Sequence, residues 1–157
     1  MKHTIQALVE NKFGVLARIA SLFSARGYNI ESLAVGQTHD ELVSCMTIVV
    51  DASDERVLDQ IKKQLNKLID VITVTDFTRR EYIDRDLMLI KVFKRGNGKK
   101  SVDKIVKKFP ARIAEEKKTY YLLEICAQRH QEDEILKELK KAGIKELVRT
   151  GRIAIAK

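Results

Sequence analysis

The spacing of apolar residues along the chain changes in the same order twice, and this repetition restricts the fold more than any other feature. In the first half, four apolar or alternating stretches predict strands at 3–9, 30–38, 42–51 and 71–77. Apolar residues three or four apart predict a helix from Val15 that ends before Gly27, and a second helix after its N-cap Ser53. The order is strand, helix, strand, strand, helix, strand.

The second half repeats this order with little residue identity. Its predicted elements are a strand at 86–93, a helix capped by Ser101 and stopped by Pro110, a hairpin of 111–114 and 120–127, a helix at 131–142, and strand segments at 144–148 and 153–156. Residues 79–85 form the linker. The simplest architecture is α+β, with two ferredoxin-like βαββαβ units of about 75 residues each. The domains are predicted at 1–78 and 79–157.

Composition excludes several classes of protein. The 157 residues are 45% hydrophobic and 33% charged, which is typical of a soluble globular protein. No apolar run approaches the ~20 residues that cross a bilayer, and the N-terminus lacks the apolar core of a signal peptide. Cys45 and Cys126 are too few for a disulfide framework. We therefore expect a cytoplasmic protein without membrane association.

The positive charge is concentrated in the second half. Residues 1–78 contain 8 Lys/Arg against 10 Asp/Glu, and residues 79–157 contain 22 against 12, so the net charges are −2 and +10. A basic half could bind nucleic acid or an acidic protein surface, or it could be only a solvated surface. Charge alone leaves these alternatives open.

Catalytic and metal-binding motifs are poorly represented. His3, His39 and His130 each occur apart from the Cys and carboxylate residues that would complete a metal site, so we expect plain surface positions and no metal. The run Gly96-Asn97-Gly98 with two lysines is only a weak phosphate-binding signal. We expect no catalytic residue on this chain.

The segment at 11–32 offers partners for a free amino acid. Gly14 at the start of a helix lets a carboxylate approach bare backbone N–H groups at the positive end of the helix dipole. Asn11 precedes it, and Asn29 is expected close by, because the helix returns the chain to the next strand; both amides can donate and accept. The alternative is that the glycines and asparagines are only turn and cap residues.

The same segment resembles a known family. Asn11-x-x-Gly14-Val15-Leu16, followed by Gly27-Tyr28-Asn29-Ile30-Glu31-Ser32-Leu33, is similar to the signature of ACT regulatory domains, in the version found in the small subunit of acetohydroxyacid (acetolactate) synthase. Residues 85–92 resemble the strand that opens that subunit's second domain, and residues 149–154 resemble its tail. Phe13 departs from the Pro or Ser common there, and could reshape or partly cover the ligand loop.

The resemblance implies a non-catalytic regulatory subunit that activates a thiamine-diphosphate-dependent large subunit and makes it sensitive to valine or another branched-chain amino acid. It implies paired ACT domains, with the effector between two chains. Carried over, Asn11, Gly14, Val15 and Leu16 form one wall, and Asn29 and Ile30 the other. No cofactor is expected on this chain; thiamine diphosphate, Mg and FAD are expected on the catalytic partner of this transferase.

Two rival interpretations remain. RNA-recognition domains share the βαββαβ order but stack bases on aromatic residues of the central strands, which 42–50 lacks; Tyr120 and Tyr121 are the only tandem aromatics. A stand-alone amino-acid sensor, or an ACT protein serving another enzyme, is the second rival. For the basic half, we hypothesise that its Lys and Arg residues, with Arg79 and Arg80, dock an acidic face of the large subunit.

Overall fold

The computed structural model describes residues 2–52 and 55–157, so Ser53 lies outside the described residues. The chain divides into two compact units. The first comprises Met1–Ile83 together with Arg152–Lys157, and the second comprises Asp84–Gly151. Both boundaries differ from the predicted division at 78/79, and the last six residues belong to the first unit rather than the second.

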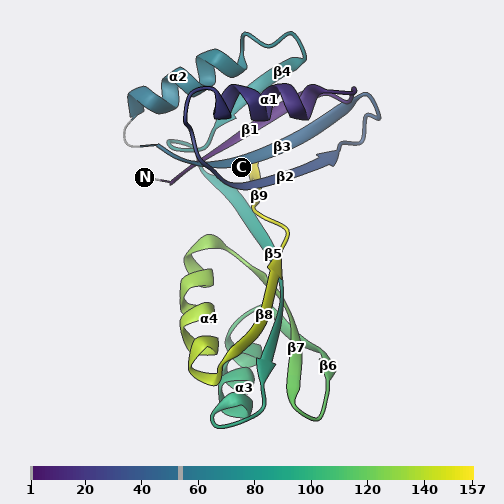
Figure 1. Cartoon of the computed structure of the whole chain (residues 1–157), viewed down its shortest axis with the longest axis vertical. Coiled ribbons are helices and arrows are strands. Elements are labelled where there is room, and N and C mark those ends of the chain that lie inside the picture. The colour runs from purple at the N-terminus through teal and green to yellow at the C-terminus, as the bar shows by residue number, and fades with distance from the viewer. Residues whose placement is uncertain (1, 53–54) are drawn as a thin grey trace. The chain divides into compact units, whose positions relative to one another are not determined.

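The first unit has the predicted element order. Its elements are β1 (Lys2–Glu10), α1 (Val15–Ser24), β2 (Ile30–Gln37), β3 (Val43–Asp51), α2 (Glu55–Leu65) and β4 (Val71–Asp76). The strands form an antiparallel sheet in the order β2-β3-β1-β4, with both helices on one face (Figure 1). This is the ferredoxin-like arrangement, and it places β2 and β4 at the edges.

Alternation along the strands builds the core of this unit. Ile5 and Ala7 on β1 face the helices and are fully buried, and Ile48 on β3 packs with them. Ile19 and Phe23 bring the apolar stripe of α1 onto the same cluster. The helix ends as predicted: Gly27 has a φ of 67°, and the N–H of the next residue donates to the Phe23 carbonyl at 3.0 Å.

The second unit repeats the topology. Its elements are β5 (Tyr82–Phe93), whose first two residues belong to the first unit, and then α3 (Gly98–Lys108), β6 (Ala111–Glu116), β7 (Tyr120–Ala127), α4 (Arg129–Ala142) and β8 (Ile144–Arg149). The strand order β6-β7-β5-β8 matches that of the first sheet, and the helices again cover one face (Figure 1). The α+β class and both βαββαβ units are therefore confirmed.

Three local predictions are wrong. The linker is shorter than predicted, because β5 is one continuous strand that already begins at Tyr82. Ser101 is no cap: it lies inside α3, which begins after Asn97, and it is buried with its hydroxyl 3.3 Å from Glu138. The segment at 153–156 forms β9 (Ile153–Ala156), which pairs with β5 and belongs to the first unit rather than ending the second.

Candidate functional site

The turn between β1 and α1 holds the first group of predicted site residues. Gly14 is the N-cap of α1 with a φ of 81°, in the left-handed region that favours glycine. No side chain among the described residues caps this helix, and its first turn contains no acidic residue. Because the first N–H groups of a helix have no partner within it, this helix start can receive a carboxylate.

Asn11 fastens this turn to the hairpin between β2 and β3. Its backbone N–H donates to the Leu42 carbonyl at 2.7 Å, and its side-chain Nδ2 donates to the Glu41 carbonyl at 2.9 Å. The side-chain nitrogen therefore has a structural role that fixes the loop. The side-chain oxygen is the acceptor that could meet a ligand ammonium group.

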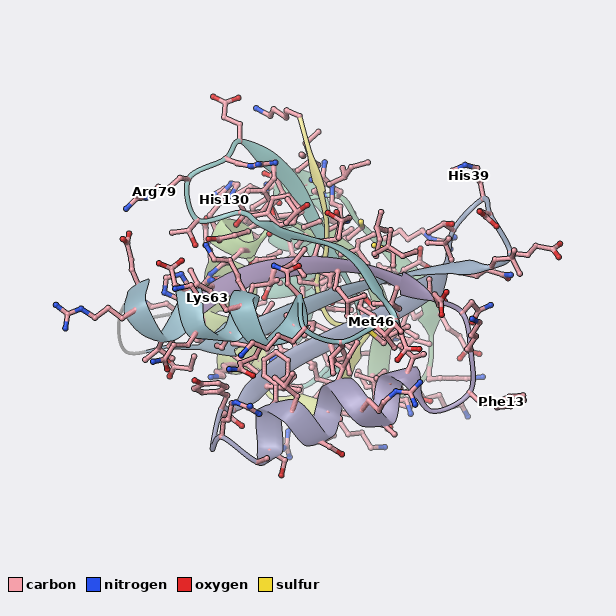
Figure 2. The ribbon with its side chains drawn as sticks, turned by 90° about the horizontal axis from the view of Figure 1, so that it is seen from above. Phe13, His39, Met46, Lys63, Arg79 and His130 are labelled. Atoms are coloured by element: carbon pink, nitrogen blue, oxygen red, sulfur yellow. The ribbon has the colours of Figure 1, made fainter. Side chains whose placement is uncertain are left out.

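The two apolar residues after Gly14 differ in exposure. Val15 is 3% exposed and packs in the core, so only its backbone can face a ligand, whereas Leu16 is 45% exposed. Phe13 is fully exposed and extends away from the ribbon, as does His39 at the hairpin turn (Figure 2). Leu16 is thus the predicted residue of this wall that offers an apolar side chain.

Arg18 is a neighbour of the helix start that the sequence patterns did not single out. Its guanidinium lies 2.9 Å from the Asp70 carboxylate, and its backbone N–H donates to the Gly14 carbonyl at 2.9 Å. A Cβ placed on Gly14 would have the Arg18 Nη1 atom as its nearest neighbour, at 3.9 Å. The spacing of four residues from a helix-opening glycine is the signal that could have found it.

Asn29 and Ile30 lie at the other end of the unit. The Asn29 carbonyl accepts from the N–H of Asp51, the last residue of β3, and Ile30 opposes Val50. Asn11, by contrast, bonds to the residue before β3 begins. A nine-residue strand is about 30 Å long, so the predicted proximity of the two asparagines within one chain is wrong.

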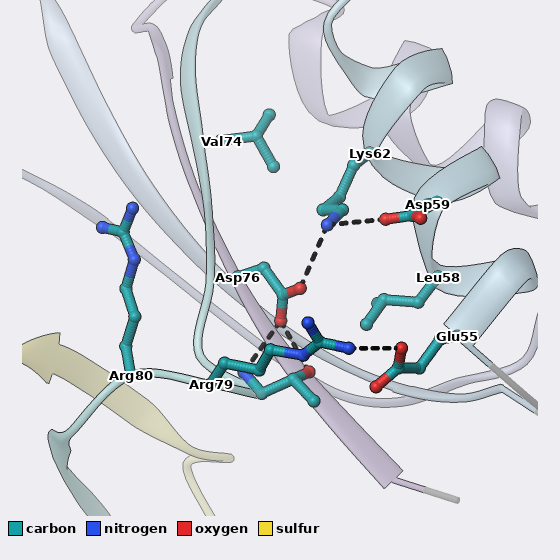
Figure 3. Close-up of a pocket in the computed structure, with 9 residues that line it drawn as sticks. Glu55, Leu58, Asp59, Lys62, Val74, Asp76, Arg79 and Arg80 are labelled. Carbon is teal, nitrogen blue, oxygen red and sulfur yellow. Dashed lines mark hydrogen bonds and ion pairs between the residues drawn. The ribbon is translucent and has the colours of Figure 1, made fainter.

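A separate charged cleft of about 360 Å³ lies between α2 and the end of β4 (Figure 3). Lys62 bridges Asp59 and Asp76 at 2.8 and 3.2 Å, and Arg79 pairs with Glu55 at 2.7 Å. The acidic groups of the cleft are thus already paired. It therefore resembles a structural ion-pair network more than an empty ligand site.

Hydrogen bonds within this cleft also shift the pKa of Asp76. Burial alone would raise it, but the hydroxyl and backbone N–H of Thr78, together with Lys62, bring it below its ordinary range. The carboxylate is therefore held in its charged form by its neighbours.

The remaining predicted features have structural explanations. His3 is not a surface residue: it is 7% exposed, and its Nδ1 lies 3.0 Å from the Thr78 hydroxyl. In the Gly96–Gly98 turn, a Cβ on Gly98 would lie 2.0 Å from the Phe93 carbonyl oxygen, so close packing requires that glycine. Within the described residues no helix could span a membrane, and no cluster of three metal-ligating side chains occurs.

Comparisons with known proteins cover the whole chain. Residues 5–73 match the model of the "AHAS small subunit-like ACT domain", and residues 85–157 match that of the "Small subunit of acetolactate synthase". Residues 74–84 lie between the two matches, and the boundary between the two units at Ile83 and Asp84 falls within them.

Similar proteins align with this chain over nearly their whole length. The probable acetolactate synthase small subunit of Archaeoglobus fulgidus is 42% identical over 157 residues, covering 100% of this chain and 98% of that protein. The acetolactate synthase small subunit of Bacillus subtilis is 38% identical, covering 100% and 91%. The crystal structure of the acetolactate synthase small subunit from Thermotoga maritima superposes with a TM-score of 0.86 at 30% identity, covering 100% and 98%. The chain therefore belongs to the family of acetolactate synthase small subunits, and its first unit is an ACT domain.

Proposed function

We propose that this chain is the non-catalytic, regulatory subunit of an acetolactate synthase and that it binds L-valine or another branched-chain amino acid. Relatives of nearly equal length carry the name of the small subunit, so the catalytic subunit is the expected partner. In this proposal thiamine diphosphate, Mg and FAD remain on the catalytic subunit. The small subunit raises the activity of the enzyme and makes it sensitive to the amino acid.

The observation that carries the proposal is the uncapped start of α1 beside an exposed leucine. Gly14 leaves the helix N-terminus without a side chain, and the helix dipole there favours a carboxylate. Leu16 gives an apolar contact for a branched side chain, and the Asn11 amide oxygen gives an acceptor for an ammonium group. The three groups therefore match the carboxylate, the side chain and the ammonium group of an aliphatic amino acid.

The second wall of the site must come from a second copy of the chain. Asn29 and Ile30 are too far from Gly14 in one chain to touch the same small molecule. Ile30 opens β2, which is an edge strand and can pair with the same strand of a second copy. A two-fold dimer of this kind supports a site with Asn29 and Ile30 of one chain facing the helix start of the other.

Reconstitution with the catalytic subunit from the same genome tests this proposal. The purified chain should raise acetolactate formation, and L-valine should inhibit the mixture more than the catalytic subunit alone. Equal valine response with and without the chain would overturn the regulatory assignment. Calorimetric titration with L-valine, L-leucine and L-isoleucine then ranks the effectors, which differ by one methyl or methylene group or by its position.

The same experiment separates the rival interpretations. A chain that binds L-valine but neither binds nor affects the catalytic subunit would be a stand-alone sensor. Nucleic-acid binding has less support, because Tyr121, one of the two tandem aromatics, is 7% exposed and lies under the Lys94 ammonium. Its ring is therefore not a free stacking platform.

A further inference from the structure

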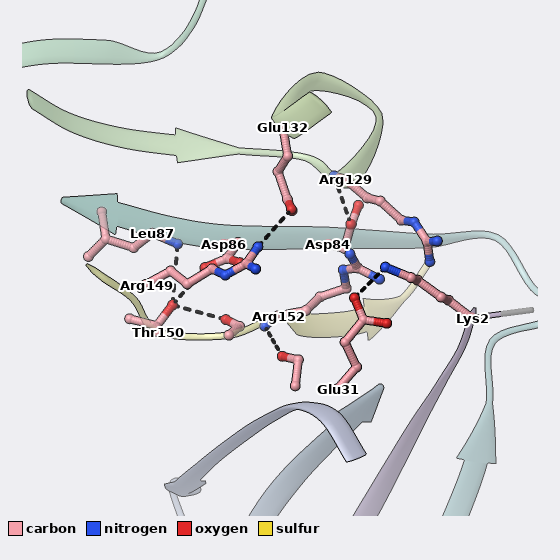
Figure 4. Close-up of polar contacts among 12 residues, drawn as sticks. Lys2, Glu31, Asp84, Asp86, Leu87, Arg129, Glu132, Arg149, Thr150 and Arg152 are labelled. Atoms are coloured by element: carbon pink, nitrogen blue, oxygen red, sulfur yellow. Dashed lines mark hydrogen bonds and ion pairs between the residues drawn. The ribbon is translucent and has the colours of Figure 1, made fainter. Parts of the chain in front are cut away.

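The segment at 152–157 is bonded to the strands of the first unit. The backbone N–H of Arg152 donates to the Ser32 hydroxyl on β2 at 3.0 Å (Figure 4). Two residues on, the Ala154 carbonyl accepts from the Gln6 side chain on β1 at 2.9 Å. This segment, which we call the tail, therefore bridges two strands of the ACT sheet.

The tail lies on the sheet face that the helices do not cover. Thr4 opposes Val49 in the β1–β3 register, next to Ile5 and Ile48, which face the helices. By alternation Thr4 and Val49 face the other way, yet they are only 4% and 2% exposed. The Arg152 guanidinium lies 3.4 Å from the Thr4 hydroxyl. The tail thus contributes to burying this face.

The Ser32 contact lies beside a β-bulge at the entrance of β2. Ile30 opposes Val50 and Ser32 opposes Val49, so Glu31 is the extra residue in the register. The Glu31 carboxylate forms an ion pair with Lys2 (Figure 4). A bulge sets the direction of the neighbouring side chains, and here the neighbour is Ile30 of the proposed effector wall.

The residues that precede the tail are bonded within the second unit. The backbone N–H of Thr150 donates to the Leu87 carbonyl at 3.0 Å, and its hydroxyl lies 3.3 Å from the Asp86 carboxylate. A single buried glycine, Gly151 with a φ of 86°, separates Thr150 from Arg152.

We propose that the tail is a clamp that positions the entrance of β2, where the proposed effector residues lie, with Ser32 and Gln6 as positioning residues. This inference rests on the proposed function, since it takes Asn29 and Ile30 as effector residues. A ligand that orders the β2 entrance strengthens the clamp, and loss of the clamp weakens the response to the ligand.

Hydrogen exchange of the full-length chain, followed by mass spectrometry, tests the clamp. The variant Ser32→Ala with Gln6→Ala removes two sheet-side partners and leaves the tail sequence intact. Without ligand, exchange at 29–33 and at 152–157 should become faster than in the parent. The single variant Ser32→Thr keeps the hydroxyl and should exchange at the parental rate. Ser24→Ala, at an exposed position of α1, is the matched control.

L-valine is the probe for coupling. In the parent it should slow exchange at 152–157 about fivefold or more, the lower end of ordinary allosteric coupling. In the double variant it should still protect 11–16 but no longer protect 152–157. Protection of 11–16 and 29–30 with an unchanged tail in the parent would overturn the clamp and leave the effector site intact.

The same experiment distinguishes a failure of the effector proposal from a failure of the clamp. If none of L-valine, L-leucine and L-isoleucine protects either wall, the effector proposal is wrong. The ligand-free comparison then decides on the clamp: parental exchange at 29–33 in the double variant overturns it, and faster exchange supports its positioning role.

Discussion

Asn11 and Asn29 lie at opposite ends of β3, one bonded to Leu42 immediately before the strand and the other to Asp51 at its last residue. One small ligand cannot touch both asparagines of one chain. A site that uses both therefore requires two chains, and binding and association become parts of one equilibrium.

The first prediction is that L-valine promotes association of the chain. The free protein should be at least a dimer at micromolar concentration, and a saturating ligand should shift dissociation to lower protein concentration. Sedimentation velocity over a dilution series, with and without L-valine, measures this shift. A monomer that binds L-valine as tightly as the assembled form would contradict the two-chain site.

The second prediction separates charge from backbone strain at Gly14. Gly14→Asp and Gly14→Asn have the same shape, and both must adopt a positive φ, which costs about 1 kcal/mol and is tolerated best by these two residues. Only Asp adds a negative charge where the ligand carboxylate is proposed to lie. Gly14→Asp should weaken L-valine binding about tenfold more than Gly14→Asn, because two like charges about 4 Å apart repel by about 1 kcal/mol even when water screens them, and more where screening is weaker.

Calorimetry of the two variants measures that ratio, and their melting temperatures show whether both remain folded. Equal affinities in the two variants would place the carboxylate elsewhere.

The third prediction concerns the basic second unit. Lys99, Lys100 and Lys107 are exposed on α3, and Arg80 is exposed before β5. If this surface docks an acidic face of the catalytic subunit, replacing the three lysines by Glu should slow association about tenfold at low salt and less at physiological salt. Stopped-flow or biosensor association rates measure this. A parental rate that does not change with salt would remove the electrostatic contribution.

The fourth prediction is a pH dependence of stability from Glu138. Hydrogen bonds from Lys104 on α3 and Lys141 on α4, at 2.9 and 3.0 Å, lower the pKa of Glu138 to about 2. Because the folded-state pKa is lowered, the stabilisation is complete above the ordinary value of 4.5 and is lost as the pH falls towards 2. Glu138→Gln should therefore lower the melting temperature at pH 7, and the difference from the parent should shrink below pH 4.5.

Asp133→Asn, on the exposed side of the same helix, is the control and should melt like the parent at both pH values. A difference between Glu138→Gln and the parent that is constant from pH 7 to acid conditions would exclude the ion pairs as its source.

The fifth prediction is that Gly98 cannot accept a side chain. A Cβ would lie 2.0 Å from the Phe93 carbonyl oxygen, a backbone atom that moves only if β5 or α3 moves. Gly98→Ala should destabilise the second unit by about 3 kcal/mol or more, as severe overpacking does. Gly36→Ala, with nothing within 4 Å of the added Cβ, is the control in urea unfolding, and equal midpoints would refute the packing constraint.

The spacing of apolar residues predicted most of the fold, because each spacing pattern depends only on the residues of one helix or strand. The alternation around Ile5 and the helical spacing from Val15 to Phe23 specify which face is buried whatever the rest of the chain does. Ile72 shows the limit. Alternation with Val74 predicts that it faces the core, but it is 56% exposed, because a register shift opposite Leu8 and Val9 turns it outward.

The start of α1 at Gly14 was predictable from the sequence, but the arrangement of the candidate site residues was not. Gly14 and the exposed Leu16 lie where the motif indicates, whereas the burial of Val15 follows from packing against α2 and the sheet. Asn11 and Asn29 are far apart because α1 runs back along β1, so that β2 starts at the end of the sheet where β1 starts. The tail was missed for a similar reason: its bonds to Gln6 and Ser32 join positions more than one hundred residues apart.

The return of the tail to the first unit has a consequence for biosynthesis. Residues 152–157 leave the ribosome only after the whole second unit has been made, so the ACT domain cannot complete its sheet face while the ribosome is still translating residues 84–151. Until then the Gln6 amide and the Ser32 hydroxyl lack their partners in the tail. Nascent chains arrested within the second unit would thus carry an ACT domain that is folded but unfinished, and a premature stop there would release a first domain lacking its own last strand.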